Sequence, residues 1–126
     1  MRIRTLVSAT VLAAVSSTAM AQSTLRPDQA AFRSLYQELV ETNTTLSAGS
    51  CTLAAERMGA RLKAAGFADS DVTLFSVPEH AKEGGLVAVL KGSSKKAKPI
   101  LLLAHIDVVE ARREDWVRDP FKLIEE

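Results

Sequence analysis

The chain has 126 residues, of which 47% are hydrophobic and 25% charged, so it fits one small globular domain and has the composition of ordinary folded proteins. A formal net charge of +1 gives no reason to expect nucleic acid or an acidic membrane surface as a partner. The single cysteine excludes an intrachain disulfide, and with it a small scaffold that depends on disulfides.

The first 21 residues have the organisation of a secretory signal peptide. Arg2 and Arg4 form a basic start, residues 6–15 are mostly apolar, and residues 19–21 read Ala-Met-Ala, a small-x-small cleavage site. The apolar stretch is shorter than the roughly 20 residues that cross a bilayer, which favours a cleaved leader over an N-terminal membrane anchor. Cleavage removes two of the 16 basic residues and none of the 15 acidic ones, leaving a net charge of −1. We therefore expect an exported protein, periplasmic or extracellular, with no membrane attachment after cleavage.

Two amphipathic helices are expected next. The first begins near Pro27, which suits the first helical position. Its apolar residues recur at the spacing of one buried face: Phe32, Leu35, Tyr36, Leu39 and Val40. The second is expected over residues 52–65, with Ser50 or Thr52 as N-cap and Gly66 directly after its end. Its buried face would consist of Ala54, Met58, Leu62 and Ala65.

Three strand candidates follow. Val72–Val77 alternates apolar and polar residues, residues 86–90 are wholly apolar after two glycines, and residues 100–103 form a continuous apolar run behind a proline. Such a run fits a strand buried on both faces, as in a parallel sheet. Residues 121–124 look like a fourth strand or its approach. The order of elements predicts an α/β domain, and a buried sheet needs further helices and strands, so we expect the N-terminal part of a longer protein.

Several polar residues have plain structural interpretations. Cys51, near the start of the second helix, is interpreted as a small packed residue rather than a nucleophile, which needs a nearby histidine as base. His80 is interpreted as an exposed loop residue. The lysines of residues 91–98 suit a solvated loop that discourages edge pairing, in preference to an anion site. Arg57 and Arg61 are expected on the solvated side of the second helix, where contact with an acidic group is the alternative.

The apolar run at residues 100–103 leads into His105 and Asp107. Side chains at positions i and i+2 of a strand point the same way, so both would emerge together at the strand's C-terminal end, where open α/β sheets bind ligands. Histidine binds a metal through one ring nitrogen while a carboxylate often holds the other, so the pair fits a metal ligand and its orienting partner. A salt-bridged pair at a strand end is the structural alternative. A Ser-His-Asp triad lacks support because no G-x-S-x-G is present.

Residues 101–109, which read Leu-Leu-Leu-Ala-His-Ile-Asp-Val-Val, are followed by Trp116 and by Asp-Pro-Phe at residues 119–121. Together they resemble the first metal-site segment of the M20 family of zinc metallopeptidases. This family includes glutamate carboxypeptidase, aminoacylase, succinyl-diaminopimelate desuccinylase and carnosinase-type dipeptidases. The end of the second predicted helix and the apolar run at residues 86–90 are also similar to the family's opening, so the resemblance covers essentially the whole mature chain.

The resemblance implies a role for each matched residue. His105 matches the histidine that binds one of two zinc ions, and Asp107 matches the aspartate that orients its imidazole. Trp116 and residues 119–121 match a structural signature without a chemical role. Two positions depart from the family pattern: Ala104 stands where glycine is usual, and Glu110 stands where proline often follows, which affects the local shape of the loop.

The implied fold is the N-terminal portion, residues 22–126, of a mixed or parallel-sheet zinc-peptidase catalytic domain. The implied activity is hydrolysis of peptide or N-acyl amide bonds, with peptides or N-acyl amino acids as substrates, through a metal-activated water. In the family the bridging aspartate, the general-base glutamate and the remaining ligands lie further along than residue 126. We therefore expect the chain alone to be inactive and to bind zinc weakly. The alternative is a small secreted α/β binding module with no catalytic activity.

Overall fold

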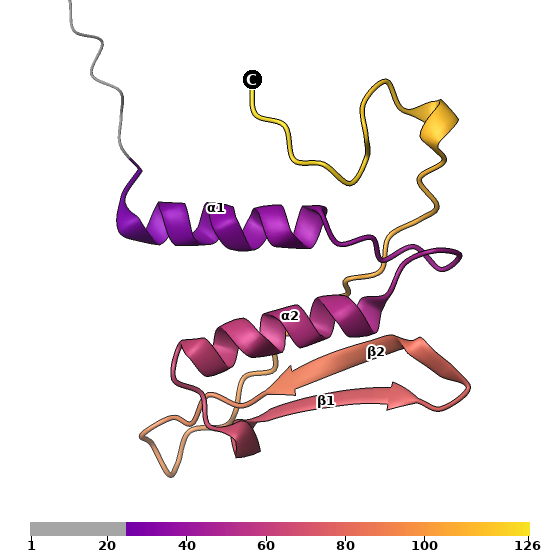
Figure 1. Ribbon diagram of the computed structural model, residues 1–126. Coiled ribbons are helices and arrows are strands. Elements are labelled where there is room, and N and C mark those ends of the chain that lie inside the picture. Colours follow the sequence, from indigo (N-terminus) through magenta and orange to yellow (C-terminus); the bar gives the residue numbers. More distant parts are fainter. Residues whose placement is uncertain (1–24) are drawn as a thin grey trace, which may run out of the picture.

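The computed structural model describes residues 25–126, so the expected leader lies outside the described residues. The described part is a small mixed α/β fold with two α-helices and a two-stranded antiparallel sheet (Figure 1). No helix in this part is long and apolar enough to cross a membrane. The elements in chain order are α1 Pro27–Val40, α2 Cys51–Ala64, the 3-10 helix η1 Asp69–Asp71, β1 Val72–Val77, β2 His80–Ala88 and the 3-10 helix η2 Arg113–Asp115.

Helix α2 begins and ends where the sequence predicts, within one residue. The hydroxyl of Ser50 accepts a hydrogen bond from the backbone N–H of Leu53 at 3.1 Å, which satisfies one of the free donors of the first turn. Gly66 follows the end of the helix with a φ of 99°, in the left-handed region that glycine enters without a steric penalty. Local signals at both ends therefore define this helix.

Helix α2 packs on the β1–β2 hairpin (Figure 1), and the buried residues at this contact are small. Ala54 and Ala55 are almost completely buried, and Val72 at the start of β1 is 8% exposed. Gly59 is also buried, and a Cβ built on it would lie 3.7 Å from the Val72 side chain. Short side chains let the helix and the sheet approach closely. Of the face predicted for α2, Ala54 is buried, Met58 and Leu62 are half-buried, and Ala65 is exposed.

Strand β1 has the predicted bounds, whereas β2 begins at His80 rather than at residue 86. Gly84 and Gly85, the two glycines before the apolar run, lie inside β2. A Cβ on Gly84 would come within 2.5 Å of the Phe75 carbonyl oxygen, and one on Gly85 within 2.5 Å of the Phe75 ring. These glycines permit close cross-strand approach rather than a change of direction. The antiparallel pairing begins with Val72 opposite Ala88, and its register shifts between residues 75 and 77.

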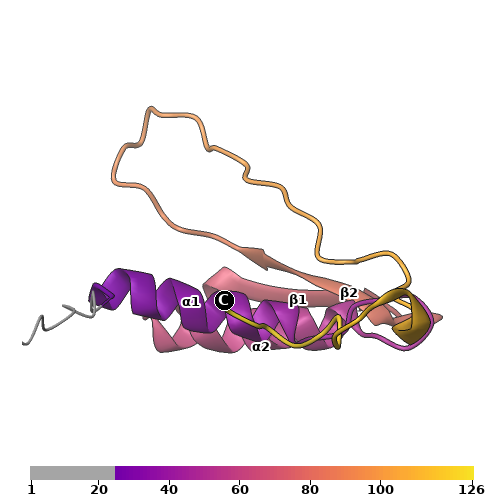
Figure 2. The same ribbon diagram turned by 90° about the horizontal axis from the view of Figure 1, so that it is seen from above.

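The apolar run at residues 100–103 is not a strand. Its four side chains are 84% to 90% exposed, and residues 89–112 contain no helix or named strand. Figure 2 shows this segment leaving β2 and returning as an open arch. The expectation of a buried strand here is wrong for this structure, because such a strand needs neighbours on its edges and layers over its faces. Within residues 25–126 the named strands pair only with each other. Residues 121–124 also form no strand.

Helix α1 begins at Pro27 as predicted, but its apolar face is not buried. None of its residues is fully buried, and Phe32 and Tyr36 stack on each other at the surface with ring centroids 6.3 Å apart. Polar contacts join it to α2 instead. The Arg61 guanidinium forms an ion pair with Glu38, and Arg57 Nη1 donates to the Thr42 hydroxyl at 2.6 Å. Of the two interpretations of these arginines, contact between Arg61 and an acidic group is the one observed.

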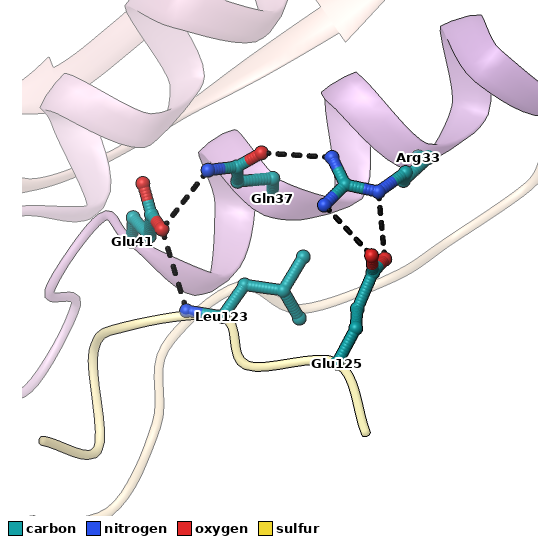
Figure 3. Close-up of polar contacts among 5 residues, drawn as sticks. All are labelled: Arg33, Gln37, Glu41, Leu123 and Glu125. Carbon is teal, nitrogen blue, oxygen red and sulfur yellow. Dashed lines mark hydrogen bonds and ion pairs between the residues drawn. The ribbon is translucent and has the colours of Figure 1, made fainter. Parts of the chain in front are cut away.

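The C-terminal segment lies along α1 (Figure 3). Arg33 donates two hydrogen bonds to the carboxylate of Glu125, at 2.6 and 2.9 Å, and a third to the side-chain oxygen of Gln37 at 3.1 Å. Gln37 donates to the Glu41 carboxylate at 3.1 Å, and the same carboxylate oxygen accepts the backbone N–H of Leu123 at 3.3 Å. A chain of polar contacts therefore attaches this segment to the helix.

Candidate functional site

The loop between α1 and α2 holds the segment that carries the predicted His-x-Asp pair. The Thr44 hydroxyl donates to the carbonyl oxygen of Ile106 at 2.7 Å, and the Val108 N–H donates to the Thr44 carbonyl oxygen at 3.5 Å. Thr45 and Val108 form an isolated parallel bridge. Buried threonines in this loop therefore replace the sheet neighbours that the sequence led us to expect.

The loop itself is compact. Gly49 and Ser50 donate backbone hydrogen bonds to Thr45 and Asn43, each at 2.9 Å, and the Asn43 side-chain oxygen accepts the N–H of Thr45 at 2.9 Å. A Cβ on Gly49 would lie 2.4 Å from the backbone nitrogen of Thr45, so the tight turn requires glycine. A loop closed in this way is a firm support for the residues packed against it.

His105 and Asp107 contact each other, as their spacing predicts. Nδ1 of His105 lies 3.2 Å from Oδ1 of Asp107 and 3.2 Å from its backbone carbonyl oxygen. The side chains are 86% and 72% exposed. When Nδ1 donates its proton to these oxygens, the neutral ring leaves its Nε2 lone pair free to bind a ligand. The geometry is that of a metal-binding imidazole with its orienting carboxylate, and the role itself stays a prediction.

A cleft of about 700 Å³ lies in front of this pair. Four parts of the chain line it: residues within 44–51 from the loop and the start of α2, Phe75 of β1, residues 79–85 from the hairpin, and residues 104–108. Long-range packing brings its ionisable groups together from these separate segments. They are Cys51, Glu79, His80, Lys82, Glu83, His105 and Asp107.

His80 differs from its predicted place. It is the first residue of β2 rather than a loop residue, although its side chain is exposed as expected. Its Nδ1 lies 3.0 Å from Oε1 of Glu83. Both histidines of the chain therefore line one cleft, each with a carboxylate at Nδ1. Sequence reasoning missed this because only the packing of the hairpin on α2 brings His80 towards His105.

Cys51 is the first residue of α2, and its thiol lies 3.9 Å from the Thr44 carbonyl oxygen. Burial raises the pKa of this thiol, and the negative charges of Asp107 and Glu83 raise it further. These effects on the pKa outweigh the opposite effect of the helix N-terminus, which would favour a thiolate. The thiol is therefore neutral near pH 7, which supports the interpretation of Cys51 as a small packed residue.

The downstream signature residues lie on the other side of the His105 segment. Trp116, Pro120 and Phe121 line a mainly apolar cavity of about 430 Å³ between the ends of α1 and α2, and His105 touches its rim. The Asp119 carboxylate accepts the backbone N–H of Phe121 at 2.9 Å, which stabilises a turn. These residues shape the chain next to His105 and contribute no reactive group to the cleft.

The donor set fits one ligand of a zinc site and not a complete site. Within residues 25–126 no three His, Cys, Asp or Glu side chains are arranged to hold a metal ion together. A catalytic zinc needs about three protein ligands and a structural zinc about four. His105 can supply one of them, with Asp107 as the partner that orients it.

Comparisons with protein-family models, curated proteins and solved structures found no significant match to this chain.

Proposed function

We propose that this chain is the N-terminal part of an exported zinc-dependent metallohydrolase of the M20 type, which cleaves peptide or N-acyl amide bonds. The observation that carries the proposal is the contact between His105 and Asp107, 3.2 Å apart at the edge of an open cleft. This contact lies within an H-x-D-V-V segment followed by W-x-x-D-P-F, the pattern that resembles the family. The expected export depends on residues 1–21 alone.

Each residue has a defined part in the proposed reaction. Asp107 accepts a hydrogen bond from Nδ1–H of His105, which sets the tautomer and makes Nε2 a better electron donor to a metal. Nε2 of His105 would hold one of two zinc ions at the cleft. Zinc ions, when bound, polarise the amide carbonyl of the substrate and activate a water molecule. Asp107 is a positioning residue in this scheme, since it acts through His105.

The apolar run at residues 100–103 supports the finer part of the proposal, a larger mixed or parallel-sheet catalytic domain. Four consecutive aliphatic side chains at 84% to 90% exposure are unusual for a folded soluble protein, and they need cover from further strands and helices. In the proposed enzyme, later parts of the protein supply that cover. The same parts supply the bridging aspartate, the general-base glutamate and the remaining ligands.

The test is to read the gene downstream of codon 126 and to assay its full product. The assay measures chelator-sensitive hydrolysis of dipeptides and N-acyl amino acids. We expect the missing acidic residues in the continued frame, and we expect His105→Ala to lower kcat/KM by at least about a thousandfold because a metal ligand is lost. His80→Gln is the matched control: it removes the other imidazole of the same cleft and should retain activity.

Two results would overturn the proposal. One is a product whose hydrolysis is indifferent to chelators and to His105→Ala. The other is a reading frame that ends at residue 126, which favours the small secreted binding module.

A further inference from the structure

The His-x-Asp segment lacks the sheet hydrogen bonds that would normally hold it in place. Residues 104–112 contain no helix and no named strand. Their polar contacts with the α1–α2 loop come from two loop residues, Thr44 and Ser47. Thr44 contacts the backbone on both sides of Asp107, at Ile106 and Val108. Ser47 contacts the chain three residues beyond Asp107, at Glu110.

Two hydrogen bonds join Ser47 and Glu110. The backbone N–H of Ser47 donates to Oε1 of Glu110 at 2.9 Å, and the Ser47 hydroxyl donates to Oε2 at 2.7 Å. Both carboxylate oxygens are therefore held, and both bonds are charge-assisted. The same bonds lower the pKa of Glu110, which keeps the carboxylate ionised as an acceptor.

We propose that the Ser47–Glu110 contact positions the His105–Asp107 pair, with Ser47 and Glu110 as positioning residues for the metal ligand. The loop side of the contact is firm because Gly49 and Asn43 close it with backbone and side-chain hydrogen bonds. The segment side is otherwise attached to the loop only at Ile106 and Val108, through Thr44 and the Thr45–Val108 bridge. The contact at Glu110 adds a further fixed point beyond Asp107, which helps to keep the Asp107 carboxylate opposite Nδ1 of His105. This inference rests on the proposed function, because His105 is a metal ligand only in the proposed enzyme. The effect of the Ser47–Glu110 contact on the geometry of His105 can be tested without metal.

The test measures the tautomer of His105 by imidazole 15N chemical shifts in the metal-free 126-residue chain at neutral pH. In the wild-type chain we expect the Nδ1–H tautomer to dominate, because Nδ1 faces the Asp107 oxygens. Ser47→Ala and Glu110→Gln should each raise the fraction of the Nε2–H tautomer at least twofold. Ser47→Thr keeps both donors and should restore the wild-type ratio.

Two controls separate positioning from general loosening. His80 is the internal control: it lies in the same cleft on its own carboxylate, Glu83, and should keep its tautomer in every variant. Glu125→Gln is the matched variant, because it removes another exposed carboxylate held by two hydrogen bonds and should leave His105 unchanged. Backbone amide signals of α2 report whether each variant is folded.

A double variant shows whether the two residues act as one unit. Ser47→Ala combined with Glu110→Gln should change the His105 tautomer by less than the sum of the two single changes, since both substitutions act on the same contact. Zinc titration of the same signals adds a second readout. The zinc concentration at half-saturation of His105 should rise about threefold to tenfold in either variant, at or below the usual effect of losing a direct partner of a metal ligand.

The outcomes distinguish this inference from the proposed function. An unchanged His105 tautomer in both folded single variants overturns the inference, whatever the enzyme does. Equal changes at His105 and His80 also overturn it, because they indicate loosening of the whole cleft. A changed tautomer at His105 alone supports it. The proposed function fails separately, through the His105→Ala assay on the full product.

Discussion

The unit formed by α2 and the β1–β2 hairpin contrasts with the segment that leaves β2 and carries the candidate site. The first unit is held by buried small residues, a capped helix and a paired hairpin. In the second, the longest apolar run is exposed, and hydrogen bonds to a neighbouring loop hold the segment of the candidate pair, His105 and Asp107. The comparison teaches that apolar character alone does not make a core. The residues must also meet partners within the folded chain.

The largest expected loss of stability comes from a steric clash in the β1–β2 hairpin. Gly84→Ala places a Cβ 2.5 Å from the Phe75 carbonyl oxygen, a backbone atom that cannot move cheaply. We expect a loss of about 1–3 kcal/mol in the free energy of unfolding, the usual cost of overpacking. Urea unfolding followed by circular dichroism measures it. Gly92→Ala is the control, because nothing lies within 4 Å of its Cβ position. Equal stability of the two variants would contradict the close cross-strand approach.

The next prediction compares the two regions directly. Val72→Ala removes methyl groups from a nearly buried side chain and should cost about 1–2 kcal/mol. Leu102→Ala removes more apolar volume from a side chain that is 90% exposed, and should change stability by less than about 0.5 kcal/mol. The measurement is the urea midpoint of each variant. If Leu102→Ala proved as costly as Val72→Ala, the apolar run would be packed in solution and the contrast would fail.

A smaller effect is expected at the start of α2. Ser50→Ala removes the hydroxyl that accepts the Leu53 N–H and should lower stability by about 1 kcal/mol. Ser50→Asp keeps an acceptor and should retain most of the stability. Thermal unfolding monitored at 222 nm compares them. No difference between the alanine and aspartate variants would show that the cap contributes nothing to this helix.

The smallest effect concerns the pH dependence of the exposed Ser47–Glu110 contact. Hydrogen bonds from Ser47 hold the pKa of Glu110 below its usual range, and the charge of Arg112 adds to the shift. Because the pKa is lower in the folded chain, the stabilisation is fully present above the unfolded pKa of about 4.3 and is lost as pH falls through the folded value. Carboxyl 13C titration should therefore show the Glu110 midpoint rising in Ser47→Ala.

Asp69 provides the reference in that titration. The ion pair with Lys63 lowers the pKa of Asp69. Because this pair is remote in sequence from Ser47 and Glu110, the titration midpoint of Asp69 should not move in Ser47→Ala. A Glu110 midpoint that stays at the wild-type value would mean that the contact is not formed in solution.

The sequence was sufficient wherever the decisive signal lies within a few residues. Helix α2 could be predicted with its Ser50 cap and Gly66 terminus, and β1 could be predicted from its alternation. The contact of His105 with Asp107 could also be predicted, because two residues of separation bring them together even outside a strand. In each case the information is local.

Tertiary structure alone decided the rest. A strand takes its hydrogen bonds from other segments, so residues 100–103 could carry a strand pattern and still be exposed. The need for Gly84 and Gly85 becomes visible only from the opposing strand, where Phe75 occupies the space that a Cβ would take. His80 joins the cleft, and Ser47 meets Glu110 across 63 positions of sequence, only because loops and hairpin pack against α2. Contacts between distant segments depend on the whole arrangement of the chain, and no local pattern encodes them.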